Sequence, residues 1–288
     1  MDVLVLKAPA KLNLYLRVLN KRPDGYHNIE TIFEKIGLCD TISLRRRRQG
    51  IKVFCRHKDV PGGKANLGFK AAQELLKHAG CSQGVEIEIK KKIPVAAGLG
   101  GGSSDAASVL LGVKRLLRLQ IPQKKLLKIA AKIGADVPFF LFSGSRAIGR
   151  GKGELLKAVN IKRKKWYVLV VPRGLAVSTK QMYQRIRRIT LTKRPYGVKI
   201  MLRALERNDL TAFNRYSYNS FEGMLQKKYN HVLEIKKALT TLGVDAALMS
   251  GSGPCVFGIA ASRKEAMYVS EQLSAKKRHW RVIVARTY

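Results

Sequence analysis

Acidic residues are scarce in this sequence. Of its 288 residues only 19 are Asp or Glu, against 56 Lys or Arg, which gives a formal net charge of +37 at pH 7. Such a charge attracts polyanions, so the chain is either a nucleic-acid binder or an enzyme of anionic substrates whose basic character is a general bias. Aromatic residues make up only 7%, and basic residues occur in every segment rather than in a tail. These features favour the enzyme, with non-specific polyanion binding still expected at low salt.

Cysteine is also rare, and long apolar runs are absent. The four cysteines (Cys39, Cys55, Cys81 and Cys255) are too far apart for a zinc finger and too few for a disulfide framework. No run of about 18 apolar residues occurs, so we expect no membrane span. The first seven residues lack the features of a signal peptide and predict a strand. We therefore expect a cytoplasmic protein with reduced thiols.

The most distinctive stretch is Pro94–Ala107, which contains Gly98, Gly100, Gly101 and Gly102. An alternating segment, residues 85–93, precedes it as a strand would, and an Ala- and Leu-rich run, residues 106–119, follows with helical periodicity. Glycine lets the backbone approach a ligand closely, and a helix start offers free N–H groups and partial positive charge. Together these features predict a phosphate site.

This glycine loop matches neither common nucleotide motif. Ser103, not lysine, follows the last glycine, so it is not a Walker A loop, and the same serine breaks a Gly-x-Gly-x-x-Gly pattern. The alternative is a flexible turn in which Ser103 or Ser104 caps the helix. Four glycines in five positions, directly before a strong helical pattern, favour the phosphate interpretation.

Three other positions carry groups suited to chemistry. Lys11 and Asn13 share the polar face of an alternating strand, residues 12–18, where the alternative is a solvated sheet face. Tyr26 and His27 follow a Pro-Asp-Gly turn and could stack on and hydrogen-bond a flat ring, or form part of an ordinary turn. Asp136 is the only acid between residues 105 and 154, and it is either a helix cap or a functional carboxylate in an apolar setting.

Periodicity and turn residues predict strands and helices along the whole chain. A basic run at residues 161–165 suggests a boundary, giving expected domains 1–160 and 161–288. Asn66 is expected to open a helix that Gly80 closes. The predicted strands are 3–6, 12–18, 29–36, 40–46, 51–56, 85–93, 166–171, 245–249, 255–260 and 280–285, and the predicted helices are 67–79, 106–119, 124–133, 178–188, 196–208, 210–225, 231–242 and 263–276.

Three motifs, in order, resemble those of the galactokinase, homoserine kinase, mevalonate kinase and phosphomevalonate kinase (GHMP kinase) superfamily. They are Pro9–Asn13, Pro94–Ala107 and the late glycine turn Ser250–Pro254. The resemblance implies an α+β, two-domain GHMP kinase fold. Its N-terminal domain would be like the second domain of ribosomal protein S5 and its C-terminal domain a ferredoxin-like α/β sandwich, with the active site in the cleft between them.

Within the superfamily, Asp24–His27, Gly98–Ser104 and Gly134–Pro138 resemble the branch acting on 4-diphosphocytidyl-2-C-methyl-D-erythritol in the non-mevalonate isoprenoid pathway. This resemblance implies ATP-dependent phosphorylation of the 2-hydroxyl of that substrate. The alternatives are a related kinase of homoserine or mevalonate and, from another class, a basic RNA-binding protein. Asn219–Glu222 loosely echoes an Asn-Asp-x-Glu segment of the family, with Ser at position 220, and receives no role.

The resemblance also implies site residues and ligands. Asp136 would be the general base, with Lys11 beside it, and Asp136 would also contact substrate. Mg²⁺ is expected with ATP, held by few protein ligands; Asp105 near the phosphates is a hypothetical contributor. The chain is expected to be a monomer or homodimer. The implied substrate-binding residues are Asn13, Tyr26, His27, Asp136, Gly251, Ser252 and Gly253, and the implied ATP-binding residues are Asn66, Leu67, Lys92, Pro94, Ala97, Gly98, Leu99, Gly100, Gly101, Gly102, Ser103 and Ser104.

Overall fold

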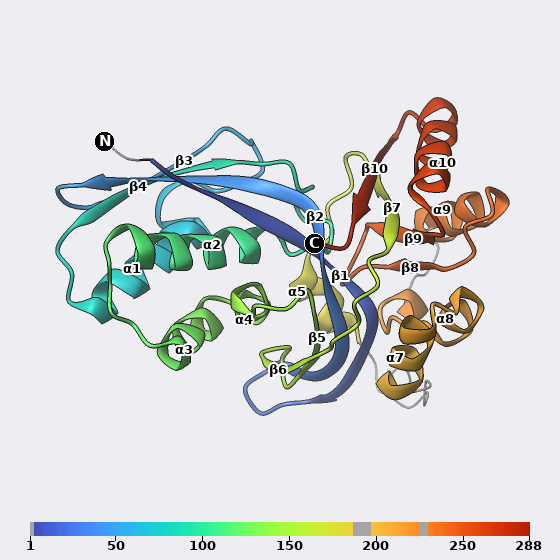
Figure 1. Cartoon of the computed structure of the whole chain (residues 1–288), viewed down its shortest axis with the longest axis horizontal. Coiled ribbons are helices and arrows are strands. Elements are labelled where there is room, and N and C mark those ends of the chain that lie inside the picture. The colour runs from blue at the N-terminus through green and yellow to red at the C-terminus, as the bar shows by residue number, and fades with distance from the viewer. Residues whose placement is uncertain (1–2, 187–196, 225–229) are drawn as a thin grey trace. The chain divides into compact units, whose positions relative to one another are not determined.

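The computed structural model describes residues 3–186, 197–224 and 230–288 and divides the chain into two compact units (Figure 1). The first unit consists of the residues up to Ala10, Leu38–Val95 and Gly100–Ser143; the second consists of Lys11–Gly37, Ala96–Leu99 and the described residues from Gly144 onward. Two long strands, β1 (Leu4–Lys21) and β2 (His27–Arg47), contribute to both units. The two compact units are therefore not continuous in sequence, because the chain passes from one to the other several times, and the domains 1–160 and 161–288 stay a prediction.

The first unit packs helices on a small sheet. Strand β2 runs antiparallel to β4 (Gly84–Lys90), and β3 (Ile51–Cys55) runs parallel to β4. Figure 1 shows the helices of this unit gathered on one side of these strands. These elements are the 3₁₀ turn η1 (Gly63–Ala65) and the helices α1 (Leu67–Ala79), α2 (Gly101–Leu116), α3 (Gln123–Ile133) and α4 (Val137–Leu141).

Helix α1 has the bounds that the sequence predicts. The Asn66 side chain accepts a hydrogen bond from the Gly68 N–H at 2.8 Å, which caps the first turn. Gly80 ends the helix in the left-handed conformation at φ 59°. The buried face is small and apolar, so α1 can pack closely on α2; it comprises Gly68, Ala71, Ala72, Leu75 and Leu76.

Helix α2 begins earlier than predicted. Gly100 is its N-cap, in the left-handed conformation at φ 69°, and Gly101 is its first residue. The alternative in which Ser103 or Ser104 caps this helix is therefore excluded, because both serines already lie in its first turn. The two glycines of that turn belong to the helix and not to the loop before it.

Predicted breaks within β1 and β2 are also wrong. The strands predicted separately over 3–6 and 12–18 form one continuous strand, β1, which includes Pro9. Proline fixes φ near −65° and removes one donor, which an extended strand tolerates where that donor is not needed. Gly37 likewise lies inside β2 without ending it.

The second unit contains an antiparallel sheet with the strand order β10-β7-β9-β8. Helices α9 (Asn230–Thr241) and α10 (Arg263–Lys276) pack against it, as Figure 1 shows. A second group of strands is formed by β2 and the hairpin of β5 and β6. The remaining bounds are β5 (Arg146–Arg150), β6 (Leu155–Ala158), β7 (Trp166–Pro172), α5 (Thr179–Arg185), α7 (Val198–Arg207), α8 (Leu210–Tyr216), η2 (Glu222–Met224), β8 (Ala247–Met249), β9 (Val256–Ala260) and β10 (Trp280–Arg286).

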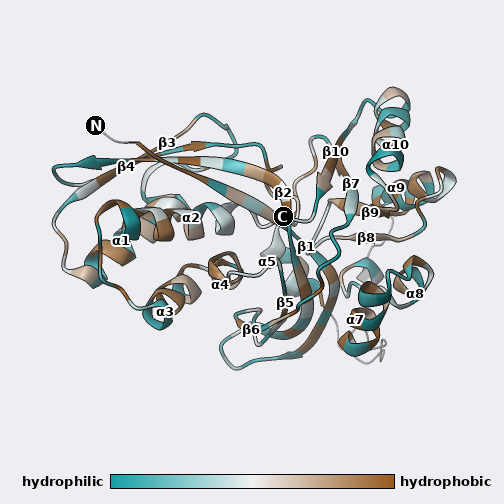
Figure 2. Cartoon of the chain, in the orientation of Figure 1, coloured by the Kyte–Doolittle hydropathy of each residue, from teal (hydrophilic) through white to brown (hydrophobic). Residues whose placement is uncertain are grey.

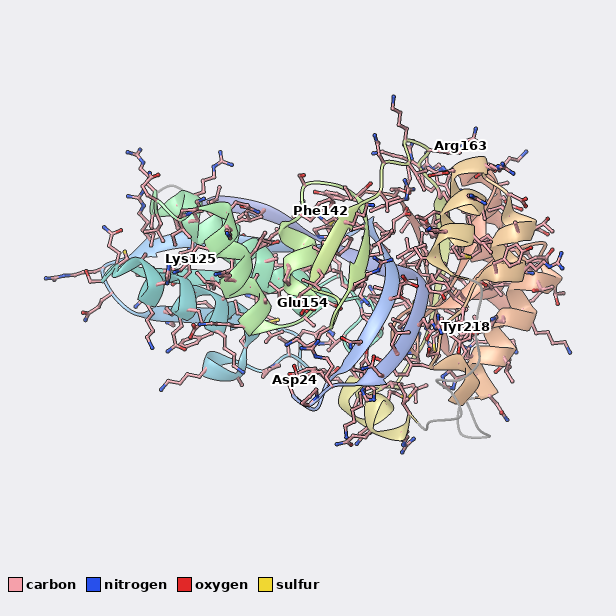
Figure 3. All side chains as sticks on the ribbon, turned by 90° about the horizontal axis from the view of Figure 1, so that it is seen from below. Asp24, Lys125, Phe142, Glu154, Arg163 and Tyr218 are labelled. Carbon is pink, nitrogen blue, oxygen red and sulfur yellow. The ribbon has the colours of Figure 1, made fainter. Side chains whose placement is uncertain are left out.

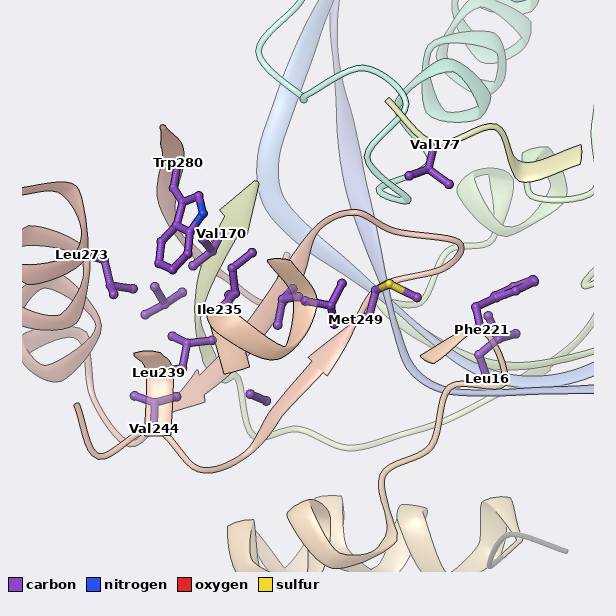
Figure 4. Close-up of a cluster of buried hydrophobic side chains, with 14 of the residues drawn as sticks. Leu16, Val170, Val177, Phe221, Ile235, Leu239, Val244, Met249, Leu273 and Trp280 are labelled. Atoms are coloured by element: carbon purple, nitrogen blue, oxygen red, sulfur yellow. The ribbon is translucent and has the colours of Figure 1, made fainter. Parts of the chain in front are cut away.

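One apolar core joins the parts of this unit. It includes Trp280, Leu273 and Ile235 from the sheet and its helices, and Leu16 and Phe221 from β1 and the segment after α8 (Figure 4). Helix α7 carries apolar and polar residues on different faces, visible as brown and teal in Figure 2.

The predicted helix over 210–225 is wrong beyond Tyr216. After α8 the backbone extends, and it pairs with β1 through hydrogen bonds from Leu16 N to Tyr218 O and from Ser220 N to Leu16 O. Pairing with a buried strand thus overrides helical periodicity here. Parts of three predicted helices, at residues 187–188, 196 and 225, lie outside the described residues.

A buried polar network connects segments of the second unit that are far apart in the sequence. Arg146 forms a two-pronged ion pair with Glu34, and the side chains of both are almost fully buried. Arg146 also donates to the Arg163 carbonyl at 2.9 Å and to the Thr287 hydroxyl at 3.2 Å. The Thr287 hydroxyl in turn donates to Glu34. Both charged groups are hydrogen-bonded, and these bonds offset the free-energy cost of removing the two charges from water.

Basic side chains dominate the surface. Figure 3 shows long side chains ending in nitrogen that extend outward, with Lys125 on α3 labelled among them. None of the helices in the described part of the chain is both long and apolar enough to span a bilayer.

Candidate active site

The first half of the glycine loop, Ala96–Leu99, is part of the second unit. The Lys11 N–H donates to the Leu99 carbonyl at 2.9 Å, and the Cys255 N–H donates to the Ala97 carbonyl at 3.3 Å. Gly98 has φ 77°, and a Cβ there would lie 2.1 Å from the Ser250 carbonyl oxygen. Only glycine permits this approach, so the loop is fixed against β1 and the late glycine turn.

The second half of the loop starts α2 in the first unit. The backbone N–H groups of Gly101, Gly102 and Ser103 precede the first intrahelical bond, which runs from Ser104 N to Gly100 O at 2.9 Å. Little side-chain bulk surrounds Gly102, and the nearest side chain is that of Leu67. A helix start with three such donors is suited to bind phosphate oxygens.

Lys11, Asn13 and Thr31 form a buried chain of hydrogen bonds in the second unit. The Lys11 ammonium donates to Asn13 Oδ1. Asn13 Nδ2 donates to the Thr31 hydroxyl at 2.8 Å, and that hydroxyl donates to the Tyr15 carbonyl at 2.6 Å. An ammonium can only donate, which fixes the amide orientation of Asn13 and so the direction of the whole chain.

Lys11 has a second contact that restrains it. Its Nζ lies 5.4 Å from the centre of the Phe33 ring, and the residue is 4% exposed. A cation over an aromatic face gains electrostatic stabilisation. Thus Lys11 is held by Asn13 and Phe33 in one place.

The late glycine turn, Ser250–Pro254, connects β8 and β9 and lies against Gly98. Ser250 Oγ donates to the Gly98 carbonyl at 3.1 Å and accepts from the Asn13 N–H at 3.3 Å. Gly251 and Gly253 have φ values of 55° and 78°, which favour glycine. The Ser252 hydroxyl is 2.9 Å from that of Thr179.

Asp105 is engaged in a buried ion triad in the first unit. Lys91 Nζ donates to Asp105 Oδ2 at 2.7 Å and also to Asp40, and Asp40 accepts from the Ile93 N–H at 2.9 Å. All three side chains are at most 5% exposed. Burial, partly offset by Lys91, raises the pKa of Asp105 to about 7. The cation that offsets this carboxylate near the phosphate loop is therefore Lys91.

Two buried side-chain oxygens of this segment have no hydrogen-bond partner: Asp105 Oδ1 and Ser104 Oγ. Both lie in the first turns of α2. Within the described ranges, no group of three or more His, Cys, Asp or Glu side chains is placed to hold a metal ion.

The residues expected near adenine all belong to the first unit: Asn66 and Leu67 at the start of α1, and Lys92 and Pro94 after β4. Asn66 uses both ends of its amide within the protein, since its Nδ2 also donates to the Pro61 carbonyl at 2.9 Å. Lys92 is exposed and Pro94 is half-buried. The Lys92 N–H donates to Asp40, which ties this segment to the ion triad.

Asp136 precedes α4 at the N-cap position, yet its side chain makes no capping hydrogen bond. The residue is half-buried, and Val137–Leu141 after it are all buried. Asp136 thus occupies the N-cap position, but the capping hydrogen bond considered for its carboxylate is not formed. The first unit holds it directly after α3, beyond Gly134.

Tyr26 and His27 lie where β2 begins, in the second unit. Tyr26 is 58% exposed, and Lys152 Nζ is 4.7 Å from the centre of its ring. The His27 ring stacks on Tyr183, with centroids 5.6 Å apart and planes at 25°. His27 Nδ1 is buried without a hydrogen-bond partner, and burial lowers the pKa of the imidazole. The lowered pKa favours the neutral imidazole, in which Nδ1 has no hydrogen-bond partner within the protein.

Comparison with known proteins identifies the family. The profile of the GHMP kinases N terminal domain matches residues 66–144, and that of the GHMP kinases C terminal matches residues 201–279. The chain is 42% identical to 4-diphosphocytidyl-2-C-methyl-D-erythritol kinase of Geobacter metallireducens, over 99% of each chain. The chain belongs to this kinase family. A member from a Synechococcus strain is 39% identical over 95% of this chain and 90% of its own length.

Solved structures agree with this membership. A crystal structure of 4-(cytidine 5'-diphospho)-2C-methyl-D-erythritol kinase matches with a TM-score of 0.84 and 35% identity, covering 98% of both chains. Homoserine kinase from Cytophaga hutchinsonii matches with a TM-score of 0.77 and 19% identity, covering 100% of this chain and 95% of its own, which shows the shared fold alone. The predicted α+β GHMP kinase fold and the kinase activity of the family are confirmed.

Sequence reasoning missed several residues that support the site. Thr31 and Lys91 belong to no motif, and Ser250 opens the late glycine turn but had no predicted role; the structure identifies each through its hydrogen-bond partners. Lys91 lies in a run of three lysines, and nothing in that run distinguishes the buried one. Asn219 and Glu222 had a signal, the loose echo of a family segment.

Proposed function

We propose that this protein transfers the γ-phosphoryl group of ATP to the 2-hydroxyl of 4-diphosphocytidyl-2-C-methyl-D-erythritol, giving the 2-phosphate and ADP. The observation that carries the proposal is 42% identity to a kinase of that name over 99% of both chains. The three superfamily motifs occur in order along the chain. The reaction is proposed to occur in the cytoplasm and to need no membrane.

For the acceptor, we propose that Asp136 takes the proton from the 2-hydroxyl while Lys11 stabilises the oxygen that attacks phosphorus. A positioned carboxylate is a suitable general base, and an ammonium favours the developing negative charge. Lys11 is held by Asn13 and Phe33, so little reorganisation is needed during reaction. The proposed role of Asn13 is then to orient Lys11 as well as the substrate.

For the donor, we propose that ATP binds as its Mg²⁺ complex with its phosphates at Gly98–Ser104. The free N–H groups at the start of α2 support this. Mg²⁺ would be bound mainly through phosphate oxygens, with few protein ligands. Asp105 is less suited to the metal, because Lys91 already binds one of its oxygens. Asn66, Leu67, Lys92 and Pro94 are proposed to border the adenine.

For specificity, we propose that the cytosine ring stacks on the exposed Tyr26 and hydrogen-bonds His27. A neutral imidazole has one donor and one acceptor nitrogen, which suits the edge of a base. The unmatched His27 Nδ1 supports this role. Gly251, Ser252 and Gly253 are proposed to bind the substrate diphosphate through backbone N–H groups and the Ser252 hydroxyl.

The test is a coupled assay of ADP release with the cytidine substrate, homoserine and mevalonate in parallel. Turnover with the cytidine ester alone is expected. Asp136→Asn should lower kcat on the order of 10²-fold or more, whereas the exposed control Asp59→Asn should leave it unchanged. Turnover with only another alcohol, or salt-resistant RNA binding without turnover, would exclude the proposal.

A further inference from the structure

We propose that Asn219 and Glu222 are positioning residues that hold the late glycine turn in the shape that binds substrate. The inference rests on the proposed binding of the substrate diphosphate by Gly251–Gly253. It assigns a role to the segment Asn219–Glu222, which the sequence singled out without a function.

The turn follows β8, the strand at one edge of a sheet. Strand β8 is the last strand in the order β10-β7-β9-β8, and it pairs with β9 on one side only. The outward N–H and C=O groups of an edge strand need other partners. Within the turn itself the backbone bonds are from Ser250 N to Cys255 O and from Gly253 N to Ser250 O, both 2.9 Å.

Asn219 supplies donors to that edge. Its Nδ2 donates to the Met249 carbonyl at 2.7 Å and to the Gly251 carbonyl at 2.8 Å. Its Oδ1 accepts from the Phe221 N–H at 2.9 Å. The amide is 2% exposed, so both of its hydrogens and its oxygen are used inside the protein. One carbonyl lies at the end of β8 and the other within the turn, so this amide sets the angle between them.

Glu222 supplies the matching acceptor. Its Oε1 accepts from the Met249 N–H at 2.6 Å, and its Oε2 accepts from Lys236 Nζ at 2.9 Å. Lys236 lies on α9, which packs against β8 and β9. The N–H and the C=O of Met249 are therefore both held by side chains of one short segment.

That segment is itself fixed to β1, the strand that carries Lys11 and Asn13. Ser220 Oγ accepts from the Val18 N–H at 2.8 Å, which also explains why Ser serves at this position. Phe221 is 1% exposed and lies beside Leu16 in the apolar core, as Figure 4 shows. The geometry thus links β1 to the glycine turn through one rigid connection.

The test compares Asn219→Asp with the matched control Asn214→Asp in the folded enzyme. Both changes add one negative charge, but Asn214 is exposed on α8, whereas the new carboxylate at 219 cannot donate to two carbonyls. We expect KM for the cytidine substrate to rise about 10- to 100-fold for Asn219→Asp, with KM for ATP within twofold of wild type. Hydrogen exchange should increase in the peptide over residues 249–253.

A second variant covers the case of poor folding. Glu222 is partly exposed, and Glu222→Met keeps its length but removes the acceptor for the Met249 N–H. The same split between the two KM values is expected, about severalfold. Unchanged KM for the cytidine substrate, or parallel changes in both KM values, in an active enzyme would overturn the inference. An inactive wild type would instead exclude the proposed function.

Discussion

Thr31→Val is the change that most directly tests how Lys11 is held. Valine has nearly the shape of threonine, but it neither accepts from Asn13 Nδ2 nor donates to the Tyr15 carbonyl. Asn13 Nδ2 then loses the hydroxyl oxygen that accepts its hydrogen bond. Its side chain can rotate, and one orientation turns Nδ2 toward the Lys11 ammonium, where two donors repel each other.

The magnitude follows from the bonds lost. Leaving a buried polar group without a partner costs about 1 to 3 kcal/mol, so the free energy of unfolding should fall by about that amount. A hydrogen bond to a charged group contributes about 1.5 to 3 kcal/mol. If that bond holds Lys11 in its reactive position, kcat should fall about 10- to 100-fold, with smaller changes in KM.

The assay is steady-state ADP release with either substrate varied, alongside thermal unfolding. Thr31→Ser keeps the hydroxyl and should restore most of the rate. Thr41→Val, on the same strand but with a hydroxyl that binds Lys7, is the matched control. A folded Thr31→Val enzyme with a kcat within twofold of wild type, or a Thr31→Ser enzyme equally slow, would refute the reasoning.

Three further outcomes are expected. Asp105 keeps its proton up to about pH 7 in the folded chain, whereas an Asp in the unfolded chain loses it near pH 4. The contribution of Asp105 to the free energy of unfolding should therefore fall by about 2 kcal/mol from pH 5 to 7. Denaturant titrations of Asp105→Asn should lack that fall. In the same variant, an altered Mg²⁺ dependence of turnover would show a metal role and contradict the role as a partner of Lys91. Tyr26→Ala should raise KM for the cytidine substrate about tenfold and leave KM for ATP nearly unchanged; equal changes would argue against stacking. Gly98→Ala should abolish activity or folding, because its Cβ meets the Ser250 carbonyl; a normal enzyme would show that the loop can move aside.

The sequence predicts best those features that depend on neighbouring residues. The cap and bounds of α1 follow from Asn66 and Gly80, and α10 is predicted with its observed bounds. The glycine loop is recognisable because its glycines and the helix after it are contiguous. In each case the physical cause acts over a few residues, which is the range that periodicity and capping rules describe.

The supporting contacts depend on partners far apart in the chain. Thr31 binds Asn13 because β1 pairs with β2, and Lys91 meets Asp40 from 51 residues away. Neither pairing leaves a local pattern, so neither could be predicted. Asn219 is intermediate, since a family segment marked the place but only the structure relates it to Met249 and Gly251.

The buried network of Glu34, Arg146 and Thr287 has a consequence for synthesis of the chain. Ser143, the last residue of the first unit, is made long before Thr287, so that unit can form while the rest of the second unit is still being translated. The second unit begins with Lys11, but its early residues form some of their hydrogen bonds with residues made much later. Glu34 and Arg146 both bond to Thr287, and the Lys35 carbonyl accepts from the Tyr288 N–H. Its strands β1 and β2 must therefore stay unaggregated until residues 287 and 288 are made. The second unit can therefore complete its fold only after residues 287 and 288 have been made, and replacing these two residues should affect it as strongly as a change in its core.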